Sequence, residues 1–231
     1  MGNRIVTFTT GTGVAATLME TAFGHLRRDI LTGVIAPGSK LRIDELRANY
    51  GIGASPLREA LSRLVYSGLV TIQGQKGFRV APVSTSDYRD ITETRKLLER
   101  AALSDSVKNG GADWEARVVA SYEQLDREHS VLHETFGATA NAWELANEEF
   151  HEALVAACTS VWVLNFRRVM YDQAARYRRL FVLEPATKRI AHDEHGEMMR
   201  AAVARDVETS CRLADSHSDR NYDMMVRLYS E

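Results

Sequence analysis

The sequence contains little cysteine and no long hydrophobic run among its 231 residues. Its two cysteines, Cys158 and Cys211, are far apart, which excludes a disulfide-stabilised scaffold and is typical of proteins from a reducing compartment. No apolar run approaches the roughly 20 residues that a membrane-spanning helix needs. Residues 1–17 lack the apolar segment and cleavage site of an export signal. We therefore expect a flexible tail over 1–17 and a cytoplasmic protein with no membrane partner.

The net charge of −2 conceals an uneven distribution of charged residues. Between Glu20 and Val83, nine lysines and arginines stand against five acidic residues, so this segment carries about +4 and the remainder about −6. A basic segment attached to an acidic body favours contact with nucleic acid through one part of the chain. Chance unevenness is the alternative, and charge alone does not separate the two.

Residues 18–81 have the pattern of a winged helix-turn-helix domain. Apolar residues at helical spacing predict three helices, over about 16–32, 44–50 and 55–64. Ser55 is expected to cap the third helix, and Pro56 to occupy its first position, where a missing N–H costs nothing. Two short strands that flank a glycine-bounded turn are predicted to form the wing, at 70–72 and 78–80.

The third helix carries the residues that we expect to contact double-stranded DNA. Arg58 lies off the apolar stripe near the amino end, where a side chain can reach a guanine edge in the major groove. Ser55 and Lys76 are expected to hold the DNA backbone, since phosphate contacts position a protein on the duplex. The remaining DNA-contacting candidates are Lys40, Arg63 and Gly77.

Residues 82–86, which include Pro82 and two serines, are the predicted linker. Beyond them the only proline is Pro185, and the pattern is helical throughout. We expect an all-α antiparallel bundle over residues 87–231. Its six or so helices are predicted at about 85–108, 113–132, 139–158, 160–183, 185–205 and 207–229. The chain is therefore expected to be mainly α.

Three of the seven histidines, His151, His195 and His217, occur in comparable settings on three bundle helices. Each lies on or beside an apolar stripe, so the three side chains could converge in the core. Three neutral imidazoles suit Zn²⁺ or a similar divalent ion, and leave coordination positions open for water or an anion. The alternative is three unrelated core or boundary histidines held by hydrogen bonds.

Arginines near the apolar faces of two bundle helices are candidates for binding an anionic ligand. Arg95 lies on the first of these helices, and Arg176 and Arg179 lie on the fourth, together with Tyr177. An arginine directed into a bundle needs a carboxylate partner, from the protein or from a ligand. A solvated face or an internal ion pair is the alternative, and at most two of the three arginines within 176–179 can face inward.

On these features the chain resembles the GntR superfamily of bacterial transcription regulators, in the FadR-type branch with a carboxyl-terminal FCD effector domain. The resemblance covers roughly residues 18–230. In the first domain it rests on residues 33–41, on the helix start Pro56–Leu61 and on residues 68–70 and 76–80. In the second domain it rests on Arg95 with Glu99, Phe150–His151, Glu194–His195 and the spacing from Asp206 to His217.

The resemblance implies a function and a metal site. Such FCD domains commonly bind a divalent metal through one Asp and three His, with a small carboxylate effector at or beside it. A metal held by His151, His195 and His217 is therefore implied, zinc first with nickel or manganese as alternatives. The Asp position is Asn147 here, whose amide oxygen can ligate but brings no charge. The resemblance also implies a homodimeric repressor on a pseudo-palindromic operator.

One departure and two finer likenesses qualify the resemblance. Family members often carry a Ser-Arg-Thr-Pro-type run where this chain has Gly53–Pro56, so its base recognition should differ from that of the common operator. Six bundle helices look closer to the VanR-like arrangement than to the seven-helix form. The residues at 57–64 and 174–178 look most like the CsiR-type regulators, which respond to glutarate.

Two other functions are compatible with three clustered histidines. A metal-dependent, hydrolase-like enzyme could use the same centre with an open coordination position. We expect no enzyme, because no Glu or His is placed as an evident general base and the wing-bearing domain would be unexplained. The histidines could also hold a purely structural metal without an effector.

Overall fold

The computed structural model describes residues 16–74, 77–131, 138–178 and 185–229. Within this part the chain divides into two compact units, one containing residues up to 28 together with 40–79, the other containing 29–39 together with residues from 80 onwards. Of the tail predicted over 1–17, residues 1–15 lie outside the described part of the chain. Lys76 and Arg179 also lie outside them.

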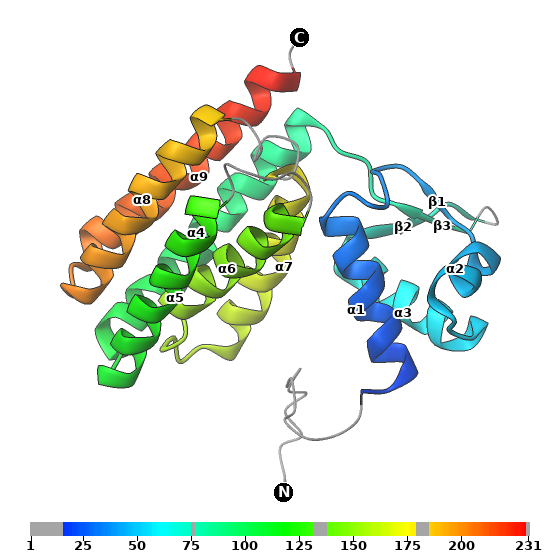
Figure 1. The fold of residues 1–231 in the computed structure, drawn as a ribbon, viewed down its shortest axis with the longest axis horizontal. Helices are drawn as coiled ribbons and strands as arrows, with labels where there is room; N and C mark the ends of the chain where they lie inside the picture. The colour runs from blue at the N-terminus through cyan, green and yellow to red at the C-terminus, as the bar shows by residue number, and fades with distance from the viewer. Residues whose placement is uncertain (1–15, 75–76, 132–137, 179–184, 230–231) are drawn as a thin grey trace, which may run out of the picture. The chain divides into compact units, whose positions relative to one another are not determined.

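Three helices and a small sheet form the amino-terminal unit (Figure 1). The helices are α1 (Leu18–Leu31), α2 (Ile43–Tyr50) and α3 (Ala54–Tyr66). The strands are β1 (Lys40–Leu41), β2 (Val70–Ile72) and β3 (Phe78–Val80), in the order β1-β3-β2, with β1 antiparallel to β3. The predicted winged helix-turn-helix is confirmed. The sequence did not indicate β1, because two residues are too few to show the alternation of a strand.

The helix starts differ from the expected ones by one or two residues. Thr17, expected in the tail, caps α1: its Oγ1 accepts from the Glu20 amide at 3.2 Å, and the Glu20 carboxylate accepts from the Thr17 amide at 2.9 Å. Helix α3 begins after Gly53 rather than at Ser55. Glycine is tolerated at this cap, so Ser55 moves into the first turn, where its side chain is exposed.

The apolar stripe of α3 forms the centre of the amino-terminal core. Leu57, Leu61 and Leu64 are fully buried and pack in the same unit as Leu26 of α1. Burying a leucine side chain contributes about 1.5–3 kcal/mol, so these residues fix which face of α3 is turned inward. The opposite face is left for contact with a partner.

Six helices of the described chain form the carboxyl-terminal bundle, as predicted (Figure 1). Helix α4 packs against α7 and α9, while α5 packs against α6 and α8. None of the helices in the described ranges combines the length and the hydrophobicity needed to cross a lipid bilayer. The helices are α4 (Thr85–Asn109), α5 (Ala112–Val131), α6 (Ala138–Leu154), α7 (Val161–Arg178), α8 (Pro185–Val203) and α9 (Val207–Tyr229).

The turn between α4 and α5 generates a prediction about packing. A Cβ atom at Gly110 would lie 2.4 Å from the ring of Trp114, which is buried in the core. Gly110→Ala is therefore expected to lower the free energy of unfolding by about 1–3 kcal/mol, measured by urea denaturation. Gly111→Ala is the matched control, because open space surrounds that position. Its cost should stay below about 1 kcal/mol, the loss of a tolerated helix cap. Equal losses in the two variants would contradict the packing argument.

Candidate metal centre and nucleic-acid interface

The outer face of α3 presents polar side chains to the solvent. Ser55, Arg58 and Glu59 are all exposed, and the Ser55 hydroxyl donates to the Glu59 carboxylate at 3.3 Å. Because Arg58 lies in the second turn from the amino end, its guanidinium can reach out along a groove. Lys40 is exposed on β1, where it pairs in register with Arg79 of β3. The domain therefore has a polar outer face on α3 and a pair of basic residues on β1 and β3.

The structure also describes two further residues that were predicted to contact DNA, Arg63 and Gly77. The guanidinium of Arg63 lies 4.5 Å from the centre of the Phe23 ring, so it packs against α1 rather than sharing the face of Arg58. Gly77 adopts a positive φ of 82° next to β3, a conformation that favours glycine. Sequence reasoning missed Tyr66, which is 93% exposed. The spacing of 55, 59, 62 and 66 places it on the outer face of α3 and could have indicated it.

The bundle brings His151 of α6, His195 of α8 and His217 of α9 into one buried cluster. Their candidate ligand nitrogens lie within 4.8 Å of one another, and the side chains are buried. Ring centroids are separated by 4.9 to 5.4 Å. The three histidines predicted from separate helices therefore converge, and the cluster could hold a metal ion.

A carboxylate sets the orientation of one imidazole in this cluster. Nδ1 of His217 lies 2.6 Å from Oε2 of Glu194, and Arg220 forms an ion pair with the same carboxylate. Because a carboxylate only accepts, Nδ1 of His217 carries a proton, and Nε2 is the ring nitrogen left for a metal. Carboxylate–histidine pairs of this kind orient the imidazole ligands of metals. The Glu194–His195 pair in the sequence thus contributes both a ligand candidate and the group that orients its neighbour.

Several nitrogen atoms of the cluster are buried without a hydrogen-bond partner. These are both ring nitrogens of His151 and Nε2 of His195. Burial lowers the pKa of each of these two imidazoles well below its ordinary value, with the neighbouring histidines acting in the same direction. Both rings are therefore neutral at pH 7, which is the form that binds a metal. Buried polar atoms without a partner carry a free-energy cost, so the cluster has the chemistry of a ligand set.

Asn147 lies one helical turn before His151 on α6 and is buried. Its Nδ2 donates to the hydroxyl of Tyr171 at 2.9 Å, which leaves Oδ1 as a fourth buried atom without a partner. One helical turn from His151, the amide thus keeps an acceptor atom available, as a metal ligand must. Three imidazoles and one amide oxygen suit zinc, nickel and related ions better than calcium or magnesium.

Three buried arginines surround the ring of Tyr171, at 5.1 to 5.8 Å from its centre. Arg167 and Arg178 have carboxylate partners, Glu99 and Glu144 respectively. Within the part of the chain that the structure describes, Arg95 forms no ion pair, and its buried Nε has no hydrogen-bond partner. Burial lowers the pKa of Arg95, yet a guanidinium stays charged at pH 7. Of these three arginines, Arg95 is therefore the one that has no ion-pair partner among the described residues.

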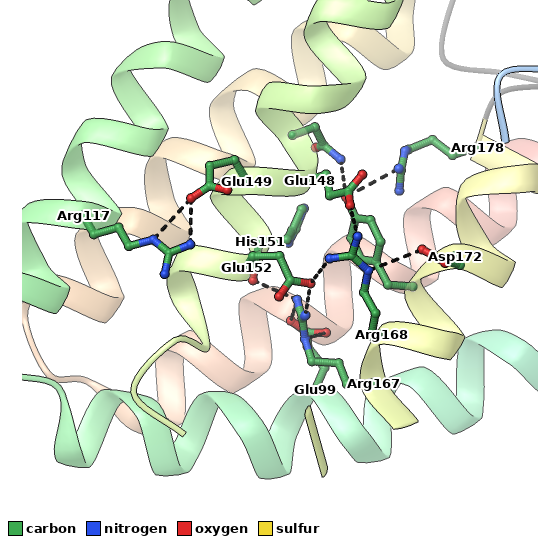
Figure 2. Close-up of polar contacts among 12 residues, drawn as sticks. Glu99, Arg117, Glu148, Glu149, His151, Glu152, Arg167, Arg168, Asp172 and Arg178 are labelled. Atoms are coloured by element: carbon green, nitrogen blue, oxygen red, sulfur yellow. Dashed lines mark hydrogen bonds and ion pairs between the residues drawn. The ribbon is translucent and has the colours of Figure 1, made fainter. Parts of the chain in front are cut away.

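Arg167 of α7 connects α4 and α6 next to His151 (Figure 2). Its guanidinium donates to Glu99 of α4 at 2.9 and 3.2 Å, to Glu152 of α6 at 2.9 Å and to the backbone oxygen of His151 at 2.8 Å. Fully satisfied charge-assisted hydrogen bonds of this kind fix geometry strongly. The backbone of His151 is therefore held by an ion pair that the sequence did not reveal.

Arg176 and Tyr177, both predicted to bind the effector, contact the chain segment before α4. Arg176 donates to the backbone oxygens of Ala81 and Pro82 at 2.7 Å. The hydroxyl of Tyr177 donates to Asp87 at 2.5 Å and accepts from the backbone amide of Ser84 at 3.2 Å. Both side chains are thus hydrogen-bonded within the carboxyl-terminal unit, while Nε of Arg176 is buried without a partner among the described residues. Their assignment to the effector stays a prediction. The predicted linker 82–86 is tied to α7, and α4 already begins at position 85.

The neutral histidines predict how stability depends on pH in the metal-free protein. Unfolding raises the pKa of His151 and His195 to about 6.5, so the unfolded chain binds more protons below that pH. The free energy of unfolding should fall as pH drops from 7.5 to 5.5, by up to about 1.4 kcal/mol per pH unit for each histidine. Urea denaturation at several pH values measures this slope. His151→Gln should reduce it, whereas the partly exposed His192→Gln should not. An unchanged slope in His151→Gln would contradict the assignment.

Family models match both halves of the chain. Residues 18–80 match the model described as bacterial regulatory proteins, gntR family, and residues 90–220 match the FCD domain. Two solved structures share the fold. One, described as E. coli McbR/YncC, has a TM-score of 0.80 at 19% identity and covers 93% of this chain and 100% of that one. The other is a putative GntR regulator from Rhodococcus sp. RHA1, with a TM-score of 0.73 at 19% identity, covering 91% and 98%.

Curated relatives are similar over most of the chain. The uncharacterized HTH-type transcriptional regulator BphR of Paraburkholderia xenovorans is 42% identical over 212 residues, covering 90% of this chain and 85% of that protein. The HTH-type transcriptional repressor GlaR of Escherichia coli is 37% identical over 196 residues, covering 83% and 88%. With a helix-turn-helix and an FCD domain in the expected order, this chain belongs to the gntR family of DNA-binding transcription regulators.

Proposed function

We propose that the protein is a homodimeric repressor whose operator binding is controlled by a small carboxylate bound beside a divalent metal. One observation carries the proposal: the unpaired charge of Arg95 is buried beside a cluster of lone pairs that have no partner. A buried charge without a partner is costly, and a ligand anion is the natural group to compensate it. Repression is supported by the name of the relative GlaR, which is a transcriptional repressor.

His151, His195 and His217 would hold the metal, with Oδ1 of Asn147 as a fourth ligand. Zinc fits this donor set best, and nickel or manganese are alternatives. When bound, the ion supplies positive charge to which a carboxylate oxygen can coordinate. Arg95 would bind the same anion through its guanidinium, in the bidentate geometry that arginine offers to carboxylates. Arg179, on the basis of the sequence, stays a further candidate for this role.

Against the enzyme alternative, the described residues include no carboxylate that both contacts the cluster and is free for acid–base chemistry. Glu194 is the carboxylate that contacts the cluster, and it is committed to His217 and to Arg220. A general base has to be within reach of the proton it abstracts and free to take it. The matched relatives are named as regulators, which agrees with control rather than turnover.

A homodimer is supported by exposed apolar side chains on α7. Trp162 and Phe166 are 71% and 56% exposed, and their rings stack with centroids 6.0 Å apart. Val161 beside them is also exposed. Contiguous exposed apolar residues are typical of surfaces that another protein covers. A two-fold dimer would bind a pseudo-palindromic operator, one half-site for each α3.

Two variants separate base reading from backbone contact. Arg58→Ala should weaken operator binding by about 1–3 kcal/mol and leave binding to random DNA nearly unchanged, because a bidentate guanine contact is lost. Lys40→Ala should weaken both to the same extent and flatten the salt dependence, because a phosphate contact is lost. Fluorescence anisotropy on operator and random duplexes at several salt concentrations measures both. Equal losses on the two duplexes for Arg58→Ala would overturn its assignment to base reading.

Replacing two buried arginines by methionine should have opposite effects on stability. Arg95→Met removes a buried charge that has no ion-pair partner among the described residues, so the free energy of unfolding of the ligand-free protein should stay unchanged or rise. Arg167→Met is the matched variant and strands Glu99 in the core, at an expected cost of about 3–5 kcal/mol. Urea denaturation of the metal-free protein measures both.

The same Arg95 variant tests the effector site. In the metal-loaded wild type, a series of small carboxylates screened by thermal shift should include one that raises the melting temperature and weakens operator binding. Arg95→Met should lose both responses and keep its operator affinity. A wild type that no carboxylate stabilises would contradict the proposed control and favour a structural metal.

A further inference from the structure

The orientation of the Asn147 amide is determined by a contact outside the histidine cluster. The Tyr171 hydroxyl accepts from Nδ2 of Asn147 at 2.9 Å, and a guanidinium nitrogen of Arg178 lies 3.5 Å from the same oxygen. Arginine can only donate, so the tyrosine oxygen serves as an acceptor on this side. The NH₂ group of Asn147 is thereby fixed on Tyr171, and Oδ1 is left for the cluster. Asn147 can therefore offer a lone pair but not a negative charge.

The charges around the cluster do not balance once a divalent ion is added. An imidazole that ligates a metal is neutral, and the amide of Asn147 is neutral as well. Two of the three arginines on Tyr171 have carboxylate partners: Arg167 pairs with Glu99 and Glu152, and Arg178 pairs with Glu144. Glu194 is shared between His217 and Arg220 and does not supply a ligand oxygen of its own. The ion would thus add two positive charges next to the unpaired Arg95, in a buried site.

A buried charge of this size is unfavourable without a counterion. A carboxylate at position 147 would supply one negative charge permanently, before any effector arrives. With an amide there, the missing charge has to come from a bound anion. The metal and the anion then stabilise each other's binding, and thermodynamic linkage requires the effect to be reciprocal.

We propose that Asn147 makes metal binding conditional on the effector anion, so that the two ligands occupy the site as a pair. This inference rests on the proposed function and adds a determinant of its regulation. Its consequence is that a carboxylate with two negative charges promotes metal binding more than one with a single charge. Asn147 is accordingly a specificity-determining residue for the anion and not only a fourth metal ligand.

Metal affinity of the full-length chain, stripped of metal, tests the proposal. Zn²⁺ and Ni²⁺ are titrated against a chromophoric chelator, with free metal corrected for complexes with the added acid. The additives are malonate, succinate and glutarate, with acetate and succinamide as singly charged and neutral controls. In the wild type, at least one of the three dicarboxylates should raise metal affinity by about 5–150-fold, the usual range of allosteric coupling. Acetate should raise it less, and succinamide should leave it unchanged.

Asn147→Asp should bind metal at least tenfold more tightly than the wild type without any anion, and the dicarboxylate should then add less than about threefold. Asn165→Asp, which adds the same charge on α7 at a residue outside the cluster, should behave like the wild type. Asn147→Ala should lose metal affinity with and without the anion. Wild-type affinity in Asn147→Ala would show that Oδ1 does not ligate and would overturn the proposal.

The failure of this proposal can be told apart from the failure of the proposed function. If wild-type metal affinity is independent of all the dicarboxylates, while one of them still stabilises the metal-loaded protein, the coupling is wrong and the effector site stands. If His151→Ala binds metal as tightly as the wild type, the metal centre itself is wrong, and this inference falls with it.

Discussion

The carboxyl-terminal domain depends on one buried ion pair, between Arg167 and Glu99. Arg167 donates four hydrogen bonds, to Glu99, to Glu152 and to the backbone oxygen of His151, so a single side chain of α7 connects α4 and α6. A paired buried charge costs little as long as every partner stays in place, and a great deal when one is removed. The histidine cluster lies directly on this connection, because the residue that Arg167 holds by its backbone is itself a ligand candidate.

The three arginines on Tyr171 differ in whether they have a carboxylate partner. Arg167 and Arg178 are satisfied within the protein and give the fold its specificity, whereas Arg95 is left without a carboxylate in the described part of the chain. Two of the arginines that contact this ring are thus in ion pairs, and the third is not. An arginine without a carboxylate keeps its capacity to bind an anion, which the proposed effector site requires.

The sequence predicted the two domains, the wing, the six bundle helices and the three histidines, because each rests on periodicity or on a local residue pattern. It did not predict the partners of the arginines. Arg95 and Arg176 looked equivalent, since both lie near an apolar face, but α7 turns Arg176 toward the backbone of Ala81 and Pro82. Likewise the Arg167–Glu99 pair joins residues 68 positions apart, a contact that no local pattern encodes. The cap of α3 was misplaced because Ser55 and Gly53 are both acceptable helix starts.

The attachment of residues 81–87 to α7 has a mechanical consequence. Tyr171, which contacts Asn147 and the arginines, precedes Arg176 and Tyr177 by five and six residues, or about 8–9 Å along the helix axis. An α-helix is stiff over so short a length, so it acts as a lever between the site and the chain that leads to the DNA-binding domain. A rotation of α7 that follows a new contact at Tyr171 would carry the backbone of Ala81 and Pro82 with it. The segment before α4 would therefore move together with α7.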